Sequence, residues 1–350
     1  MAGKKEVGSD NPSPAAKTVK FDFSGKDQPL IAVKNVSKGY RKKIVLKDVN
    51  VDIFKGDIFG IIGMSGSGKT TMFQLMSGVL KPKAGDVLVK SDLFYKDKKN
   101  IPDFVSVYRN HNNVRKHFGF AAQIPSFYEH LTVEENLMMY GSLYRMKKKD
   151  VIENMDRLLK LVDLKDEKDT LAAELSGGMQ RRLDIACSLI HDPEVLFLDE
   201  PTSDLDPVMR KQIWALIKEI NSKGTTIVLA SHILEEVENL CTKVAILHDK
   251  RVLGYGSLKD LKKLFKRNRI LKVELEKGDY TQIIRKLNRI KGVEKTSKKD
   301  GTLIVSLTPD DKIVRQAMKT VDSSKDRLVS IEMSDATLND IFETLMRKSE

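Results

Sequence analysis

The segment from Gly63 to Thr70 constrains this chain more than any other part of its sequence. Its residues, Gly-Met-Ser-Gly-Ser-Gly-Lys-Thr, satisfy the pattern G-x-x-x-x-G-K-[ST], which in phosphate-binding loops follows a strand and opens a helix. Both neighbours are present, because Ile58 to Ile62 is an apolar run of strand length and apolar side chains follow at helical spacing at Met72, Phe73 and Met76. The segment therefore predicts an α/β fold with a loop that binds phosphate groups.

The chemistry of such a loop assigns roles to its residues. Glycines let backbone N–H groups curl around phosphate oxygens, and the helix that begins near Lys69 adds the positive end of its dipole. We expect Lys69 to reach the β- and γ-phosphates and the Thr70 hydroxyl to bind Mg²⁺. The residues expected to hold the nucleotide phosphates are Gly63, Met64, Ser65, Gly66, Ser67, Gly68, Lys69, Thr70 and Thr71.

A second apolar strand ends in two acids, Asp199 and Glu200. It lies in the segment Glu-Val-Leu-Phe-Leu-Asp-Glu-Pro, residues 194 to 201, and its acids would lie beside the phosphate loop if the two strands are neighbours. In phosphoryl transfer one carboxylate holds Mg²⁺ and another group orients or deprotonates the attacking water. We therefore assign Asp199 to the metal and Glu200 to the water. The alternative is that both acids only cap the turn at Pro201.

The order of predicted elements divides the chain. Short apolar strands alternate with helices from Leu30 to about Leu253, which is typical of an α/β domain. Between Phe127 and Ile185 the pattern predicts almost uninterrupted helix, beginning with a capping box at Thr132 and Glu135. We expect a disordered tail at 1–28, a large domain at 29–266 with a helical subdomain at about 127–185, and a small α+β domain at 267–350.

Bulk properties exclude several classes of protein. No apolar run approaches the roughly 18 residues of a membrane-spanning helix, so the chain is not expected to cross a membrane by itself. Cys187 and Cys241 lie in apolar patterns without metal-ligand spacing, which predicts buried thiols in a reducing cytosol. The net charge is +12, but the lysines are not interleaved with aromatic residues, so nucleic-acid binding is not favoured.

The segment Leu-Ser-Gly-Gly-Met-Gln-Arg-Arg, residues 175 to 182, closely resembles the signature of ABC ATPases. The resemblance implies a P-loop NTPase cassette with an inserted helical subdomain, and a dimer in which each signature grips the γ-phosphate of ATP bound to the other subunit. One copy of the motif implies a homodimer or a heterodimer. The signature residues expected to bind nucleotide are Leu175, Ser176, Gly177, Gly178 and Gln180.

Five further residues match elements of the same family. Tyr40 resembles the aromatic residue that stacks on adenine, and Gln123 resembles the glutamine that contacts Mg²⁺ and senses the membrane subunit. Asp204 and Asp206 resemble the loop that crosses the dimer interface, and His232 resembles the histidine that contacts the γ-phosphate. Each residue also has a purely structural alternative. Tyr40 would be a hairpin residue, Gln123 a polar loop residue, Asp204 and Asp206 turn or cap residues, and His232 a structural histidine.

The end of the chain indicates the type of transporter. Residues 336 to 342, Ala-Thr-Leu-Asn-Asp-Ile-Phe, resemble a segment of exporter ATPases of the ABC-2 class, although a helix capped by Thr337 and Asp340 would give the same pattern. The resemblance implies that the chain hydrolyses ATP with Mg²⁺ and works with a separate membrane permease. It also implies that the chain lies on the cytoplasmic face of the membrane. The alternatives are a soluble ABC ATPase acting on ribosomes or nucleic acid, and a nucleotide switch without turnover.

Overall fold

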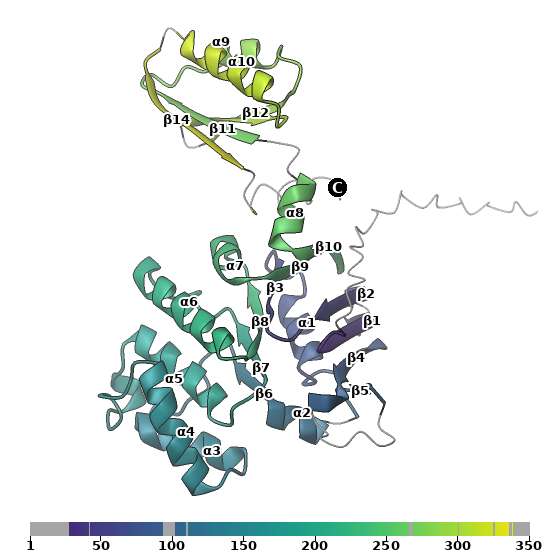
Figure 1. Cartoon of the computed structure of the whole chain (residues 1–350), viewed down its shortest axis with the longest axis vertical. Helices are drawn as coiled ribbons and strands as arrows, with labels where there is room; N and C mark the ends of the chain where they lie inside the picture. Colours follow the sequence, from purple (N-terminus) through teal and green to yellow (C-terminus); the bar gives the residue numbers. More distant parts are fainter. Residues whose placement is uncertain are drawn as a thin grey trace, which may run out of the picture.

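The computed structural model describes residues 28–41, 43–93, 102–109, 111–265, 269–299, 301–324, 326–335 and 338. The predicted tail at 1–28 therefore lies outside the described residues, apart from Gln28. The described residues form an N-terminal unit, 28–265, and a C-terminal unit, 269–335 (Figure 1). The N-terminal unit is built on a central sheet with the order β10-β9-β3-β8-β7-β6. Its strands are β3 (Ile58–Gly63), β6 (Phe118–Ala121), β7 (Val195–Asp199), β8 (Thr226–Ser231), β9 (Lys243–His248) and β10 (Arg251–Ser257).

The direction of these strands places the site. β3, β6, β7 and β8 are parallel, with β8 pairing to both β3 and β7. Their carboxyl ends therefore meet at one edge of the sheet, where ligands bind in open α/β folds. The predicted α/β architecture is confirmed.

Each central strand is buried on both faces, and alternate side chains enter two different cores. On β7, Leu196 and Leu198 belong to one core, while Val195 and Phe197 belong to the other. The first core is filled by α5 (Gly177–Leu189), α6 (Pro207–Ser222) and α7 (Leu234–Leu240), and the second by α1 (Lys69–Met76). Continuous apolar strands of this kind are expected where both faces of a sheet are covered.

A second, antiparallel sheet covers the α1 side. Its order is β2-β1-β4-β5, with β1 (Ile31–Tyr40), β2 (Lys43–Ile53), β4 (Ala84–Lys90) and β5 (Phe104–Ser106). The short helix α2 (His111–His117) and the 3-10 turn η1 (Ser91–Leu93) complete this side. η1, β5 and the beginning of α2 lie in the segment 91–113, whose sequence carries no recognisable functional motif.

The helical subdomain contains α3 (Val133–Leu143), α4 (Lys148–Leu161) and the beginning of α5, grouped at one end of the N-terminal unit (Figure 1). Thr132 and Glu135 form the capping box predicted at the start of α3. The expectation of almost uninterrupted helix was wrong between Val162 and Ser176. That stretch consists of turns and the short η2 (Ala172–Glu174), because some of its backbone groups form local turns and others bond to the segment 129–134.

The C-terminal unit has one helix-covered sheet with the order β12-β13-β11-β14. Its elements are β11 (Arg269–Leu275), α9 (Thr281–Leu287), β12 (Val293–Lys299), β13 (Thr302–Leu307), α10 (Asp311–Asp322) and β14 (Leu328–Asp335), and α8 (Leu258–Phe265) leads into it. This order of strands and helices is that of a split βαβ fold, which belongs to the α+β class expected for this part of the chain. Of the segment 336–342 only Leu338 lies within the described residues, and it is buried in the core of the N-terminal unit.

Two expectations from the bulk sequence can be compared directly with the structure. Among the described residues, none of the helices combines the length and the apolar character that a membrane crossing requires. Cys187 and Cys241 are both buried free thiols, as predicted.

Candidate functional site

A cavity of about 450 Å³ lies at the carboxyl edge of the central sheet. Its walls come from the phosphate loop and α1, from the ends of β7 and β8, and from the segment after β6. The lining residues are Val45, Ser65, Gly66, Gly68, Lys69, Thr70, Thr71, Gln123, Glu200 and His232. Residues from distant parts of the sequence therefore meet around one space.

The backbone of the phosphate loop suits an anion. Gly66 and Gly68 have φ angles of 78° and 103°, which glycine adopts without strain. A Cβ atom on Gly66 would meet no atom within 4 Å, so this side of the loop is open. α1 begins at Lys69 with no side-chain cap and no acid in its first turn, and its N-terminal N–H groups therefore remain available to an anion.

The carboxylate of Glu200 lies between Lys69 and His232. Its Oε2 atom is 2.6 Å from Nδ1 of His232 and accepts a second contact, at 3.3 Å, from the His232 backbone N–H. Its Oε1 atom is 3.8 Å from Nζ of Lys69, which also donates to the carbonyl of Gly63 at 2.9 Å. Only 9% of Glu200 is exposed, so these contacts, rather than bulk water, fix the direction of the carboxylate.

Asp199 lies directly before Glu200 and close to Thr70. Burial raises the pKa of Asp199, the charge of Glu200 raises it further, and the opposite influences include Lys69 and a hydrogen bond from the side chain of Thr70. Two adjacent buried acids favour a nearby cation, since a positive charge stabilises the ionised form of both. Thr70 and Asp199 together offer the oxygen donors that Mg²⁺ prefers.

The two functional strands are not direct neighbours, although the sequence-based prediction required them to be. β8 lies between β3 and β7. The acids nevertheless reach the phosphate loop because all three strands are parallel and end at the same edge. Insertion of β8 also brings His232, which follows Ser231, into contact with Glu200.

The signature residues lie away from this cavity. Ser176 and Gly177 are exposed at the start of α5, where the Ser176 hydroxyl accepts from the N–H of Met179 at 3.4 Å. The first turn of α5 contains no acidic residue. Leu175 is buried, and the side chain of Gln180 donates to the carbonyl of Ala172. Each chain therefore carries a second helix N-terminus without acidic residues. It is exposed on the surface and lies apart from the phosphate loop of the same chain.

Two further predicted residues, Asp206 and Asp204, show contacts that match their structural alternatives. Asp206 caps α6, because its Oδ1 atom accepts from the N–H groups of Val208 and Met209 at 2.8 and 3.0 Å. Asp204 is exposed and accepts a hydrogen bond from Ser203. Tyr40, which is 47% exposed at the end of β1, does not line the cavity, whereas Gln123 does.

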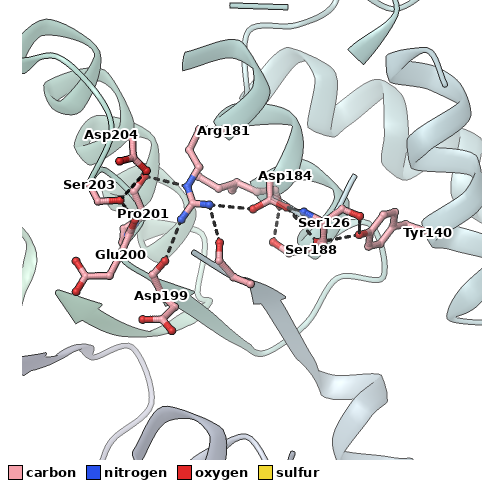
Figure 2. A network of polar contacts seen from close by, with 12 residues as sticks. Ser126, Tyr140, Arg181, Asp184, Ser188, Asp199, Glu200, Pro201, Ser203 and Asp204 are labelled. Carbon is pink, nitrogen blue, oxygen red and sulfur yellow. Dashed lines mark hydrogen bonds and ion pairs between the residues drawn. The ribbon is translucent and has the colours of Figure 1, made fainter. Parts of the chain in front are cut away.

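Sequence reasoning missed a group of buried polar residues behind the acids. Arg181 donates to the backbone carbonyls of Ala122, Asp199 and Pro201 and to the carboxylate of Asp184 (Figure 2). The available signal was an Arg and an Asp three residues apart within a helix that is otherwise largely apolar. Val45, which lines the cavity from β2, carried no such signal.

Comparisons with protein families cover both units. Residues 46–203 match the family model described as "ABC transporter", and residues 256–345 match the model described as "ATP-binding protein DrrA1-3-like, C-terminal domain". The two matched ranges are separated by the part of the sheet that carries His232.

Curated relatives agree with the family models. The Nod factor export ATP-binding protein I of Rhizobium leguminosarum bv. viciae is 34% identical over 247 residues, covering 71% of this chain and 72% of the relative. The bacitracin transport ATP-binding protein BcrA of Bacillus licheniformis is 36% identical over 238 residues, with 67% and 72% covered. The linearmycin resistance ATP-binding protein LnrL of Bacillus subtilis (strain 168) is 26% identical over 315 residues, covering 89% of this chain and 97% of the relative.

Solved structures share the fold of the N-terminal unit. The cbiO1 protein of Clostridium perfringens, part of the ABC transporter complex cbiONQ, is similar with a TM-score of 0.59 and 28% identity, covering 75% of this chain and 95% of that one. An ATP-binding cassette solved as a dimer in a post-hydrolysis state with ADP and phosphate is similar with a TM-score of 0.55 and 27% identity, covering 65% and 98%.

Proposed function

Since the chain belongs to the ABC transporter ATP-binding proteins, whose cassettes bind and hydrolyse ATP, we propose that Glu200 directs the attacking water at this cavity. One observation supports the assignment above all: the Glu200 carboxylate is held between Lys69 and His232 at the wall of the phosphate-loop cavity. A base must lie within reach of the reacting group before its pKa matters. Glu200 lines the cavity and is 9% exposed, which supports this role.

The proposed reaction is hydrolysis of the γ-phosphate. Lys69 leaves the carbonyl of Gly63 and, with the N–H groups of the loop, binds the β- and γ-phosphates. Water held by Glu200 attacks the γ-phosphorus, the bond to the bridging oxygen breaks, and the water proton passes to Glu200. His232 keeps Glu200 oriented and contacts the γ-phosphate. Positive groups already in place at the developing charge lower the barrier, because they need not reorganise during the reaction.

Mg²⁺ fits the donors on this side of the cavity. Thr70, Asp199 and Gln123 would hold it, in keeping with the raised pKa of Asp199 and with the hydrogen bond between Thr70 and Asp199. When bound, Mg²⁺ neutralises charge on the phosphate oxygens.

A second cassette completes the site. The exposed turn at Ser176 and Gly177 begins a helix without acidic residues in its first turn, which is suited to a phosphate, yet it lies away from the cavity of its own chain. We therefore propose that each ATP lies between the phosphate loop of one cassette and the signature turn of another. Tyr40 stacks on the adenine of the bound nucleotide, and Asp204 and Asp206 lie at the contact between the cassettes.

We propose that the cassettes drive a membrane permease of the exporter type. They contact this permease on the cytoplasmic face of the membrane. The relatives are named for export of Nod factor and for bacitracin transport, and the C-terminal unit matches a domain described for DrrA-like ATP-binding proteins. Ile124, which is 81% exposed directly after Gln123, supplies an apolar contact for such a partner. These relatives support the transport function over the alternative of action on ribosomes or nucleic acid.

Phosphate release by the Glu200→Gln variant tests the assignment of the water-directing group. We expect turnover to fall by about 10²–10⁴-fold with little change in ATP affinity, because the amide cannot accept the proton. Glu194→Gln is a matched control, since Glu194 lies at the opposite end of the same strand segment and faces His117 at 2.7 Å. Equal turnover in wild type and Glu200→Gln would contradict the proposal.

Light scattering of Glu200→Gln with and without ATP tests the pairing of cassettes. Dimerisation of the purified chain on addition of ATP would show that two identical copies can form the sandwich. A chain that binds ATP and remains monomeric would contradict a homodimer and require a different cassette as the partner.

A further inference from the structure

Arg181 is a buried cation on α5 that is bonded to two segments distant from it in the sequence. Arg181 is 6% exposed, and its guanidinium donates to the carbonyl of Pro201 at 2.9 Å, of Asp199 at 3.1 Å and of Ala122 at 2.7 Å. Figure 2 shows the guanidinium placed between the end of β7 and the loop that follows β6. These carbonyls lie on both sides of Glu200 and directly before Gln123.

Asp184 extends the network in the opposite direction. It lies one turn further along α5, where its Oδ2 atom accepts from Arg181 at 3.1 Å and its Oδ1 atom accepts from the N–H and hydroxyl of Ser126 at 3.0 and 3.2 Å. The hydroxyl of Tyr140, on α3, lies 2.7 Å from the carbonyl of Ser126. The network therefore connects the end of β7 through α5 to the loop 122–126 and to the helical subdomain.

The chemistry of this network depends on a guanidinium. Arginine carries five N–H donors in a planar fork, whereas lysine carries three donors on one nitrogen. Only the fork can reach carbonyls on two segments and a carboxylate on a third. Burial lowers the pKa of Arg181 and raises the pKa of Asp184, while each opposite charge acts against that change. Burial also raises the pKa of Tyr140 to about 12, so its hydroxyl remains a donor at neutral pH.

We propose that Arg181 and Asp184 are positioning residues that hold the backbone around Glu200 and the loop 122–126 in one fixed relation, so that movement of that loop is passed to the catalytic carboxylate. The inference rests on the proposed role of Glu200. The inference is based on an unbroken chain of hydrogen bonds between described residues, which runs from Asp199 to Tyr140. The two charged residues in this chain, Arg181 and Asp184, are almost completely buried. A displacement of Ser126 must therefore break these bonds or move their partners.

Steady-state ATP hydrolysis by Arg181→Lys is the first test. The substitution keeps the charge and most of the stem but cannot satisfy all four acceptors. We expect kcat to fall about ten- to hundredfold, the range produced by a misplacement of about 1 Å, with KM for ATP unchanged within about twofold. The concentration of ATP-binding sites is titrated with a fluorescent ATP analogue, and kcat is calculated per site. An unfolded fraction of the protein therefore does not lower the measured kcat.

Arg182→Lys provides the matched control. Arg182 is the next residue of α5, and its guanidinium contacts the carbonyl of Val162, Asp163 and Gln212, away from the acids. We expect this variant to keep the wild-type kcat. Equal values of kcat for wild type and Arg181→Lys, or an equal loss in both lysine variants, would overturn the inference.

Hydrogen exchange tests transmission through Asp184. In the Glu200→Gln background, which we expect to bind ATP without hydrolysing it, ATP should change the exchange of the peptide covering 124–129. Adding Asp184→Asn or Tyr140→Phe should reduce this change by at least half without loss of ATP binding. A full ATP-dependent change in both double variants would show that the network does not transmit.

The outcomes separate this inference from the proposed function. If Glu200→Gln hydrolyses ATP as fast as wild type, the role of Glu200 fails, and the inference fails with it. If Glu200→Gln is inactive and Arg181→Lys has a normal kcat, the role of Glu200 stands and the inference alone is refuted.

Discussion

Glu236 provides a sharp test of how burial and hydrogen bonding are balanced behind the site. It is 0% exposed on α7, and its Oε1 atom accepts from the hydroxyl of Thr202 at 2.6 Å and from the indole N–H of Trp214 at 3.1 Å. Glu236→Ala leaves two buried donors without this acceptor, each costing about 1–3 kcal/mol, so we expect a loss of about 2–6 kcal/mol in the free energy of unfolding. Glu236→Gln keeps the acceptor and removes only the ionisable proton.

The pH dependence distinguishes the two effects. Burial is the largest cause that raises the pKa of Glu236 above its ordinary 4.5, while hydrogen bonds from Ser231, Thr202 and Trp214 lower it. A carboxyl whose folded pKa is raised carries no ionisation penalty below its unfolded pKa. The penalty grows as the pH rises from the unfolded to the folded pKa and is constant above it, at about 1.4 kcal/mol for each pH unit that separates the two pKa values. Glu236→Gln should therefore gain stability relative to wild type as the pH rises above the ordinary pKa of 4.5.

Trp214 is the single tryptophan of the chain and bonds directly to Glu236, so urea unfolding followed by its fluorescence reports on this site. We expect the free energy of unfolding of Glu236→Gln, relative to that of wild type, to be higher at about pH 8 than at about pH 5. A difference between the two proteins that does not change with pH would refute the ionisation argument. If Gln and Ala were equally destabilising at the lower pH, the hydrogen-bond argument would be refuted.

Three further predictions concern the core and the nucleotide. Phe197→Ala should destabilise the protein by about 3–5 kcal/mol in thermal or urea unfolding, because the buried ring packs against three other phenylalanine rings; a loss below about 1 kcal/mol would contradict this. Gly63→Ala should abolish binding of a fluorescent ATP analogue, because the new Cβ would lie 2.4 Å from Ser67 Oγ and 2.6 Å from the Leu247 carbonyl; wild-type affinity would contradict the cradle geometry. Tyr40→Ala should raise KM for ATP while Tyr40→Phe keeps it, since stacking needs the ring and not the hydroxyl; equal KM in both would argue against adenine stacking.

Local patterns predicted the parts of this fold that depend on neighbouring residues. The family resemblance drawn from the signature and phosphate loop is confirmed by the relatives, and the capping box of α3 is confirmed by its two reciprocal hydrogen bonds. The predicted strand Ile58 to Ile62 differs from β3 by a single residue at its end. These features are encoded within short windows, where glycine, cap and apolar spacing determine the backbone.

Contacts between distant residues could not be predicted in the same way. The order β3-β8-β7 is set by the packing of whole strands. Lys69 and Glu200 are too far apart in the sequence for a local pattern to predict their contact. The irregular stretch Val162–Ser176 was mistaken for helix because part of its backbone bonds to the segment 129–134, a pairing that no local pattern encodes. A site that two chains form together, such as the one proposed at Ser176, cannot be recognised from a window of a single sequence.

Buried polar groups hold the segment around Glu200 from two sides. Arg181 binds the carbonyls of Asp199 and Pro201, and Glu236 binds Thr202. Between them Glu200 has a φ angle of 49°, a conformation that costs a non-glycine residue about 1–3 kcal/mol and persists only where surrounding contacts enforce it. The N–H of Glu200 donates to the carbonyl of Ala230 at 2.8 Å, which adds a third restraint. Because the restraints share one short segment, losses of kcat on removing Arg181 and Glu236 contacts should not be additive: once one side is released, the strained residue can relax, and the second release has less to change.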